Sequence, residues 1–115
     1  MPRVPLDATL AQAVMEMTQK GMAMTAVLYP DGRVAGVFTD GDLRRCLTRV
    51  SDLNQARVAE FMATNPHTIG ADQLAVDAVE MIERYKSFMQ LLVVDEAGKL
   101  IGALHLHDLL RAKVL

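Results

Sequence analysis

The order of apolar and polar residues predicts a helix, a hairpin and a second helix in the first 50 residues. Apolar side chains first recur at the spacing of one helix face, at Leu10, Ala13, Val14 and Met17. Gly21 follows as a helix stop. The apolar runs "TAVLY" and "RVAGVF" then flank residues 29–32, whose second-place proline and fourth-place glycine suit a type I turn. A second helix is expected from about Asp40, and "VPL" before the first helix adds a short strand.

The pattern repeats at an offset of 66 residues, where "KGMAMTAVLYPDGRVAGVFTDGDLRR" aligns with "KSFMQLLVVDEAGKLIGALHLHDLLR". The matched positions include Lys20 and Lys86, Gly32 and Gly98, Gly36 and Gly102, Asp42 and Asp108, Leu43 and Leu109, and Arg45 and Arg111. Upstream the offset is nearer 65, and the second helix face comprises Leu74, Ala78, Met81, Ile82 and Tyr85. "HTI" adds a strand, residues 96–98 form the second hairpin turn, and a last helix starts near Leu106. The chain therefore reads as β-α-β-β-α, twice.

This repeat divides the chain into three segments. We expect a first repeat over residues 1–50, a connecting segment over 51–63 with a short helix at 56–62, and a second repeat over 64–115; Asn65-Pro66 ends the connecting helix. A unit of roughly 50 residues buries too little surface to be secure alone. The predicted fold is therefore α/β (α+β), with two repeats packed through their sheets about a pseudo-two-fold axis. Such packing leaves two clefts at the strand ends, a favoured place for small molecules.

Composition narrows the function. The chain is 51% hydrophobic, which suits a packed core, and its formal net charge of -2 disfavours a nucleic-acid polymer as partner. No apolar run approaches the roughly 20 residues needed to span a bilayer, and "MPRVPLD" lacks the apolar segment of a signal peptide. The single cysteine, Cys46, cannot form an internal disulfide. We therefore expect a cytoplasmic protein without a membrane partner.

The doubled unit, with Gly-apolar-apolar-Thr-x-x-Asp at its last strand–helix joint, resembles a tandem CBS domain pair. More narrowly, "GVFTDGDLRRCL" and "GALHLHDLLRAKVL" are similar to the C-terminal CBS pair of bacterial D-arabinose 5-phosphate isomerases, where the pair follows a sugar-isomerase (SIS) domain. The resemblance implies a non-catalytic regulatory module of a larger isomerase of lipopolysaccharide biosynthesis. Its partners would be the SIS domain and further copies, as a homodimer or higher oligomer.

Two interpretations of Thr39 and Asp42 stay open. A threonine followed three residues later by an acid is close to a capping box, and capping alone would account for both side chains. In the second repeat, His105 replaces Thr39 while Asp108 keeps the place of Asp42, which indicates a separate duty for the acid. By resemblance, each aspartate accepts hydrogen bonds from ribose hydroxyls, and the threonine faces a phosphate. Thr39 and Asp42 would then line one cleft, and His105 and Asp108 the other.

His105 and His107 replace Thr39 and Gly41, and a histidine can bind an added carboxylate or phosphate. We therefore expect a nucleotide or nucleotide sugar, with CMP-Kdo as the leading candidate, an adenine nucleotide as the alternative, and no required cofactor. Further candidate ligand-binding residues are Arg45 and Arg111 for positive charge, and Met24, Thr25, Pro66, His67, Thr68, Met89 and Gln90 for the cleft walls. The arginines also suit a solvated helix face.

Three other hypotheses remain. His67, His105, His107 and Asp108 suggest a metal site, although their spacing matches no strong zinc pattern. Cys46 reads as a small core residue rather than a nucleophile, because nothing pairs it with a base. The strongest rival is a ligand-free structural module that only helps to assemble the parent enzyme.

Overall fold

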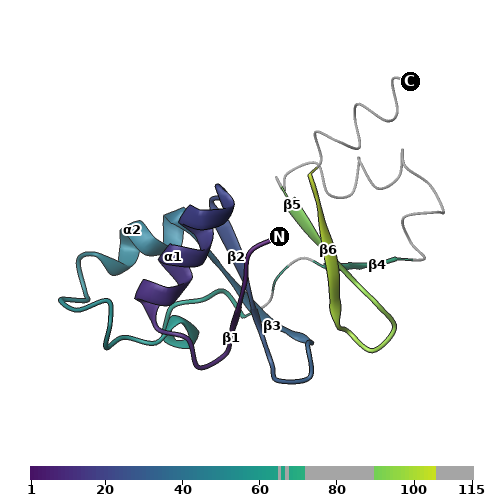
Figure 1. Ribbon diagram of the computed structural model, residues 1–115, viewed down its shortest axis with the longest axis horizontal. Helices are drawn as coiled ribbons and strands as arrows, with labels where there is room; N and C mark the ends of the chain where they lie inside the picture. Colours follow the sequence, from purple (N-terminus) through teal and green to yellow (C-terminus); the bar gives the residue numbers. More distant parts are fainter. Residues whose placement is uncertain (65, 67, 72–89, 106–115) are drawn as a thin grey trace. The chain divides into compact units, whose positions relative to one another are not determined.

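The structure is a computed structural model that describes residues 1–64, 66, 68–71 and 90–105, in two compact units, Met1–Pro66 and His67–Leu115. The first unit contains β1 (Arg3–Pro5), α1 (Leu10–Lys20), β2 (Met24–Leu28), β3 (Val34–Thr39), α2 (Asp40–Cys46) and a 3₁₀ helix, η1 (Val58–Glu60). The second contains β4 (Thr68–Gly70), β5 (Gln90–Val94) and β6 (Leu100–His105). Each unit has a three-stranded sheet, and both helices of the first unit cover one face of its sheet (Figure 1).

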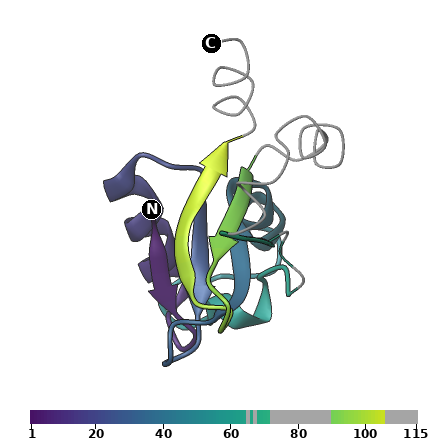
Figure 2. The same cartoon turned by 90° about the vertical axis from the view of Figure 1, so that its right-hand side faces the viewer.

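The two sheets share their pairing and their register. β1 is parallel to β2 and β2 is antiparallel to β3, just as β4 is parallel to β5 and β5 is antiparallel to β6 (Figure 2). Both hairpins shift register at the same step, between Val27 and Leu28 in one unit and between Val93 and Val94 in the other. The predicted repeat is therefore confirmed for all six strands.

Glycine sets the turn of each hairpin. The Gly32 amide donates to the Tyr29 carbonyl at 2.9 Å, and the Gly98 amide donates to the Asp95 carbonyl at 3.0 Å. Both glycines have positive φ, at 93° and 84°, where a side chain would be strained. The predicted four-residue turn at 29–32 is confirmed, and its counterpart in the second repeat starts at Asp95, one residue before the predicted 96–98.

Local chemistry also fixes both ends of α1. The Gln12 amide donates to the Thr9 hydroxyl oxygen at 3.1 Å, and the Thr9 amide donates to the Gln12 side-chain oxygen at 2.8 Å. This capping box satisfies two amides that helix geometry leaves free. At the other end, Gly21 has φ 65° and its amide donates to the Met17 and Thr18 carbonyls. The predicted stop at Gly21 is confirmed.

The connecting segment contains a shorter helix than predicted, and it packs against the first unit. Only Val58–Glu60 is helical, as a 3₁₀ turn, whereas a helix was expected over 56–62. The helix ends there because Ala63 exchanges two backbone hydrogen bonds with Val37, at 2.8 and 3.0 Å, which needs extended backbone. Val58 joins the core of the first unit, whose buried members are Val4, Ala8, Leu10, Ala13, Met17, Val27, Phe38, Cys46 and Val58.

The segment that follows η1 crosses β3 at a glycine. A β-carbon added to Gly36 would lie 2.5 Å from the Ala63 carbonyl oxygen and 2.7 Å from the Met62 sulfur. Only glycine therefore permits this approach. The helices predicted over 74–85 and from Leu106 lie outside the described residues. Within the described part of the chain, no helix is long and apolar enough to cross a bilayer.

Candidate ligand-binding site

Thr39 and Asp42 meet where β3 runs directly into α2. The Asp42 amide donates to the Thr39 hydroxyl oxygen at 3.2 Å, and Asp42 Oδ2 accepts from the Thr39 amide at 3.0 Å and from its hydroxyl at 3.1 Å. The two residues thus form a complete capping box. The capping interpretation is confirmed as a description of the contacts, and the remaining question is whether any binding capacity is left.

Arg45 completes the coordination of Asp42. Its Nη2 donates to Asp42 Oδ1 at 2.6 Å, in a charge-assisted pair one helical turn apart. The Arg45 guanidinium lies over Gly41, where an added β-carbon would be 3.5 Å from Nη1. A side chain as small as alanine at position 41 would therefore only touch the arginine and would not displace it from the carboxylate.

With respect to the described residues, the Asp42 carboxylate retains one acceptor position. A carboxylate offers about four lone-pair positions, and three donors occupy them here: the Thr39 amide, the Thr39 hydroxyl and Arg45. The free position is on Oδ1, next to a guanidinium that is 73% exposed and carries further N–H donors. A sugar hydroxyl suits this pair, because it can donate to the carboxylate and accept from the arginine. The Thr39 hydroxyl, by contrast, already donates its only proton to Asp42 Oδ2 and has none left for a ligand.

The strand beside β3 brings one predicted residue to the joint and turns another inward. Met24 is the direct partner of Thr39 across the β2–β3 pair and is half-buried. Thr25 pairs with Phe38 and is fully buried, and its hydroxyl donates to the Ala26 carbonyl at 3.1 Å. Met24 is therefore the better placed of the two to contact a ligand at Asp42.

The second repeat is described only in its sheet. Gln90 is paired with His105 across β5 and β6, as Met24 is with Thr39 in the first sheet. Thr68 begins β4 and is exposed, and Pro66 is half-buried. The other predicted site residues of this repeat, His67, Met89, His107, Asp108 and Arg111, lie outside the described residues, so their role stays a prediction.

The metal hypothesis rests mainly on that same undescribed part. Among the described residues, no group of three or more His, Cys, Asp and Glu side chains could hold an ion. Cys46 is 2% exposed within the core, which confirms its prediction as a small core residue. Burial raises the pKa of its thiol, and Asp42 raises it further, against smaller opposite effects of Arg45 and Arg49.

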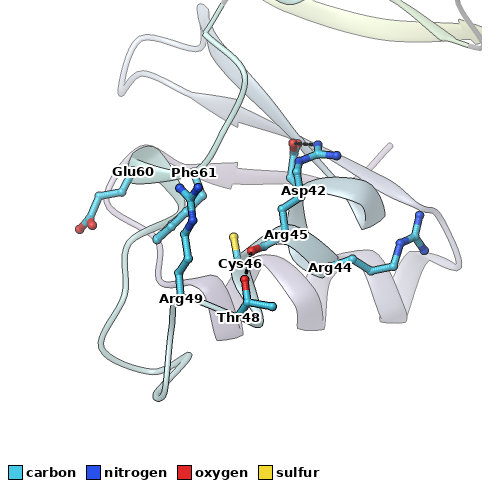
Figure 3. A pocket seen from close by; sticks show the side chains of 8 residues that line it. All are labelled: Asp42, Arg44, Arg45, Cys46, Thr48, Arg49, Glu60 and Phe61. Carbon is cyan, nitrogen blue, oxygen red and sulfur yellow. Dashed lines mark hydrogen bonds and ion pairs between the residues drawn. The ribbon is translucent and has the colours of Figure 1, made fainter.

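A pocket of about 510 Å³ lies along α2 and was not expected from the sequence. Its walls come from α2, from the residues just after it and from η1, and they include Arg45, Arg49, Thr48 and Phe61 (Figure 3). Arg49 lies in the turn just after α2, which ends at Cys46, so its nearness in sequence to Arg45 was the available signal for this wall. Phe61 had no such signal, because its place depends on how the chain returns to the first unit.

The chain belongs to the CBS domain family. The family model, described as "CBS domain", matches residues 1–49 and 58–115, so two copies cover nearly the whole chain. The class of protein is therefore a non-catalytic CBS pair, as the resemblance of the doubled unit implied.

The curated relatives that match the whole chain are arabinose 5-phosphate isomerases. The chain is 45% identical over all 115 residues to "Arabinose 5-phosphate isomerase KdsD" of Pseudomonas aeruginosa, covering 35% of that protein. It is 37% identical to the protein of the same name from Yersinia pestis, covering 34%. The chain thus spans about a third of the length of these curated relatives.

Solved structures match the fold throughout. A CBS domain-containing protein of Bacillus anthracis superposes with a TM-score of 0.84 at 16% identity, covering 97% of this chain and 83% of that one. The CBS domain protein PAE2072 of Pyrobaculum aerophilum, complexed with AMP, gives 0.74 at 20% identity over 100% and 94%. The cytosolic domain of the Mg²⁺ channel MgtE, in complex with ATP, gives 0.78 at 24% identity over 96% and 44%. These likenesses confirm the mixed α/β fold of a CBS pair.

Proposed function

We propose that this CBS pair is a nucleotide sensor of a larger arabinose 5-phosphate isomerase, with CMP-Kdo as its ligand. The observation that carries the proposal is the acceptor position left on Asp42 Oδ1 beside the Arg45 guanidinium, after the capping box is complete. A residue that served only as a cap would need no exposed cation on its second oxygen. Two CBS proteins of the same fold are complexed with AMP and with ATP, which supports a nucleotide as the class of ligand.

Kdo chemistry favours a nucleotide sugar over a plain nucleotide. CMP-Kdo combines a cytidine nucleotide with a carboxylate and many hydroxyls. The hydroxyls suit the carboxylate–guanidinium pair of Asp42 and Arg45, and the added carboxylate suits His105 and His107 of the second repeat. An adenine nucleotide offers these histidines only its phosphates, whereas CMP-Kdo offers a phosphate and a carboxylate.

An isomerase domain in the same protein would give the CBS pair an activity to regulate. The relatives that match the whole chain are named arabinose 5-phosphate isomerases, and two thirds of their length lies outside this region. By the family resemblance, that length holds the SIS domain, and CMP-Kdo is the activated end product of its pathway. Ligand binding would tune the isomerase if it favours one docking of the CBS pair on the catalytic domain over another. Assembly into a homodimer or higher oligomer would be part of that docking.

Calorimetric titration with CMP-Kdo, CMP, AMP and ATP tests the proposal on the wild type, Asp42→Ala and Asp108→Ala. We expect CMP-Kdo to bind and the other three to bind more weakly or not at all. Loss of a charged acceptor to a sugar hydroxyl weakens binding by about tenfold or more. We expect that loss in Asp42→Ala, which removes the acceptor beside Arg45, and in Asp108→Ala, in the repeat that carries the histidines.

Thr9→Ala is the matched control, because Thr9 closes a capping box of the same kind on α1. It costs about 1 kcal/mol of stability, as loss of a cap does, without touching the joint. Equal loss of binding in Thr9→Ala and the aspartate variants would mean that all three act through stability. Tight binding of AMP or ATP alone would keep the sensor class and exclude CMP-Kdo. Absence of heat with all four ligands would favour the structural module.

A further inference from the structure

The pocket between α2 and η1 is built largely from cationic and apolar groups. Three arginines, Arg44, Arg45 and Arg49, lie along it with two carboxylates, those of Asp42 and Glu60. Figure 3 shows Arg49 extending beside Phe61, with Arg45 turned back to Asp42 and the Cys46 sulfur between them in this view. In the same view, Arg44 and Glu60 extend outward. Arg45 and Arg49 therefore lie on the two sides of the Cys46 sulfur in this view, on an exposed surface of the first unit.

Among the described residues, Arg44 and Arg49 are the two cations of the pocket without a carboxylate partner, and of these Arg49 extends beside Phe61 (Figure 3). Arg45 pairs with Asp42 at 2.6 Å, whereas among the described residues no acid lies within ion-pair distance of Arg49. An unpaired guanidinium beside an aromatic ring is a ready partner for an anion.

The size of the pocket suits a small molecule. Its volume of about 510 Å³ falls within the range of small-molecule sites, about 300 to 1,000 Å³. A guanidinium binds phosphate through two parallel N–H donors. The three arginines of the pocket outnumber its two carboxylates, which favours a multiply charged anion over a single carboxylate. Phe61 then offers an apolar wall to the rest of the molecule.

We propose that this pocket binds the phosphate group of a small phosphorylated metabolite, with Arg49 as its principal contact and Arg45 as its second cation. The site lies wholly within the first unit. It shares Asp42 and Arg45 with the proposed nucleotide site, and Arg49 is a cation that belongs to this pocket alone.

The test is titration of the full chain, labelled with ¹⁵N, with inorganic phosphate, followed by NMR. We expect saturable shifts at the Arg49 side-chain N–H and at the Thr48 and Phe61 amides. Arg49→Gln should weaken the apparent affinity by about tenfold or more, because it removes a charge-assisted contact. Arg44→Gln removes the same charge from the same part of the chain, with a side chain that points away, and should leave the affinity within about twofold.

Two further arms sharpen the result. Acetate at equal ionic strength should produce no saturable shift at these positions, and Arg49→Gln should bind CMP-Kdo with the affinity of the wild type. Equal weakening in both arginine variants, an equal response to acetate, or no saturable shift would each overturn the proposal. So would loss of CMP-Kdo binding in Arg49→Gln, since the pocket would then be part of the nucleotide site. A failure of CMP-Kdo to bind the wild type would leave the phosphate result standing.

Discussion

At the scale of single residues, Glu16 links the middle of α1 to the first strand. Its Oε2 accepts from the Arg3 amide at 3.0 Å and lies 3.4 Å from the Lys20 ammonium group. The hydrogen bond from Arg3 lowers the pKa of the Glu16 carboxyl, burial acts against it, and the charge of Lys20 lowers it further. The charged form of Glu16 is therefore favoured by folding.

This linkage predicts a loss of stability in acid. Since the folded pKa lies below the unfolded value of about 4.3, Glu16 contributes stability above that pH, and the contribution is lost as the pH falls through the folded pKa. Glu16→Gln should unfold with a shallower pH dependence between pH 6 and 3, by about 1 kcal/mol or less, because the group is near the surface. Urea unfolding of both proteins across this range measures the difference. Parallel curves would show that the contact with Arg3 does not depend on charge.

At the scale of elements, residues 62–63 can cross β3 closely only because residue 36 is a glycine. A methyl group on Gly36 would meet the Ala63 carbonyl oxygen and the Met62 sulfur at 2.5 and 2.7 Å. The oxygen is held by its hydrogen bond from the Val37 amide at 3.0 Å, so it cannot retreat without breaking the bridge.

Gly36→Ala should therefore destabilise the chain by about 1 to 3 kcal/mol, as overpacking does. Gly102→Ala is its matched control, because Gly102 holds the same place in β6 and an added β-carbon there meets no described atom within 4 Å. We expect its effect to stay within about 0.5 kcal/mol. Chemical denaturation of the two variants compares them, and equal losses would mean that the close approach at Gly36 is relaxed in solution.

The contact of residues 62–63 with β3 could not be predicted from the sequence, whereas the local turns could. Gly21 and Gly32 were predictable because a helix stop and a tight turn are local events with their own residue chemistry. The strand register of the second unit followed from the internal repeat. The contact of Ala63 with Gly36 joins residues far apart in the sequence, and no local pattern encodes it.

The candidate site was predictable to a similar extent. The spacing of Thr39 and Asp42 predicted a capping box, and the structure contains one. The pairing of Asp42 with Arg45 has the i, i+3 spacing of a helical ion pair, yet its effect on the remaining acceptor position needed the full set of contacts. The capping box at Thr9 and Gln12 also had a signal, a threonine three residues before a glutamine at the head of an apolar run.

At the scale of the whole molecule, the connecting segment behaves as part of the first unit. The first amides of a helix have no partner within it. In α1, two of them are satisfied from residues 51–63: Leu10 donates to the Ala56 carbonyl at 2.9 Å and Ala11 to the Leu53 carbonyl at 3.0 Å. Val58, fully buried, donates its own amide to the Ala8 carbonyl at 3.0 Å.

These contacts predict that residues 53–58 open only when the first unit unfolds. Native-state hydrogen exchange of the full chain should give the amides of Leu10, Ala11 and Val58 the same opening free energy as the paired amides of β2 and β3, because cooperative units exchange together. The Asn54 amide, which donates to the exposed Asp52 carboxylate at 2.9 Å, should exchange much faster. It serves as the reference for an amide that exchanges by local opening. Exchange of Val58 and Leu10 on the order of tenfold or more faster than the strands would make residues 51–63 a linker that opens on its own. Equal opening free energies would instead mean that the first CBS repeat unfolds as one unit that extends to about Pro66. That unit would include η1, which forms one wall of the phosphate pocket.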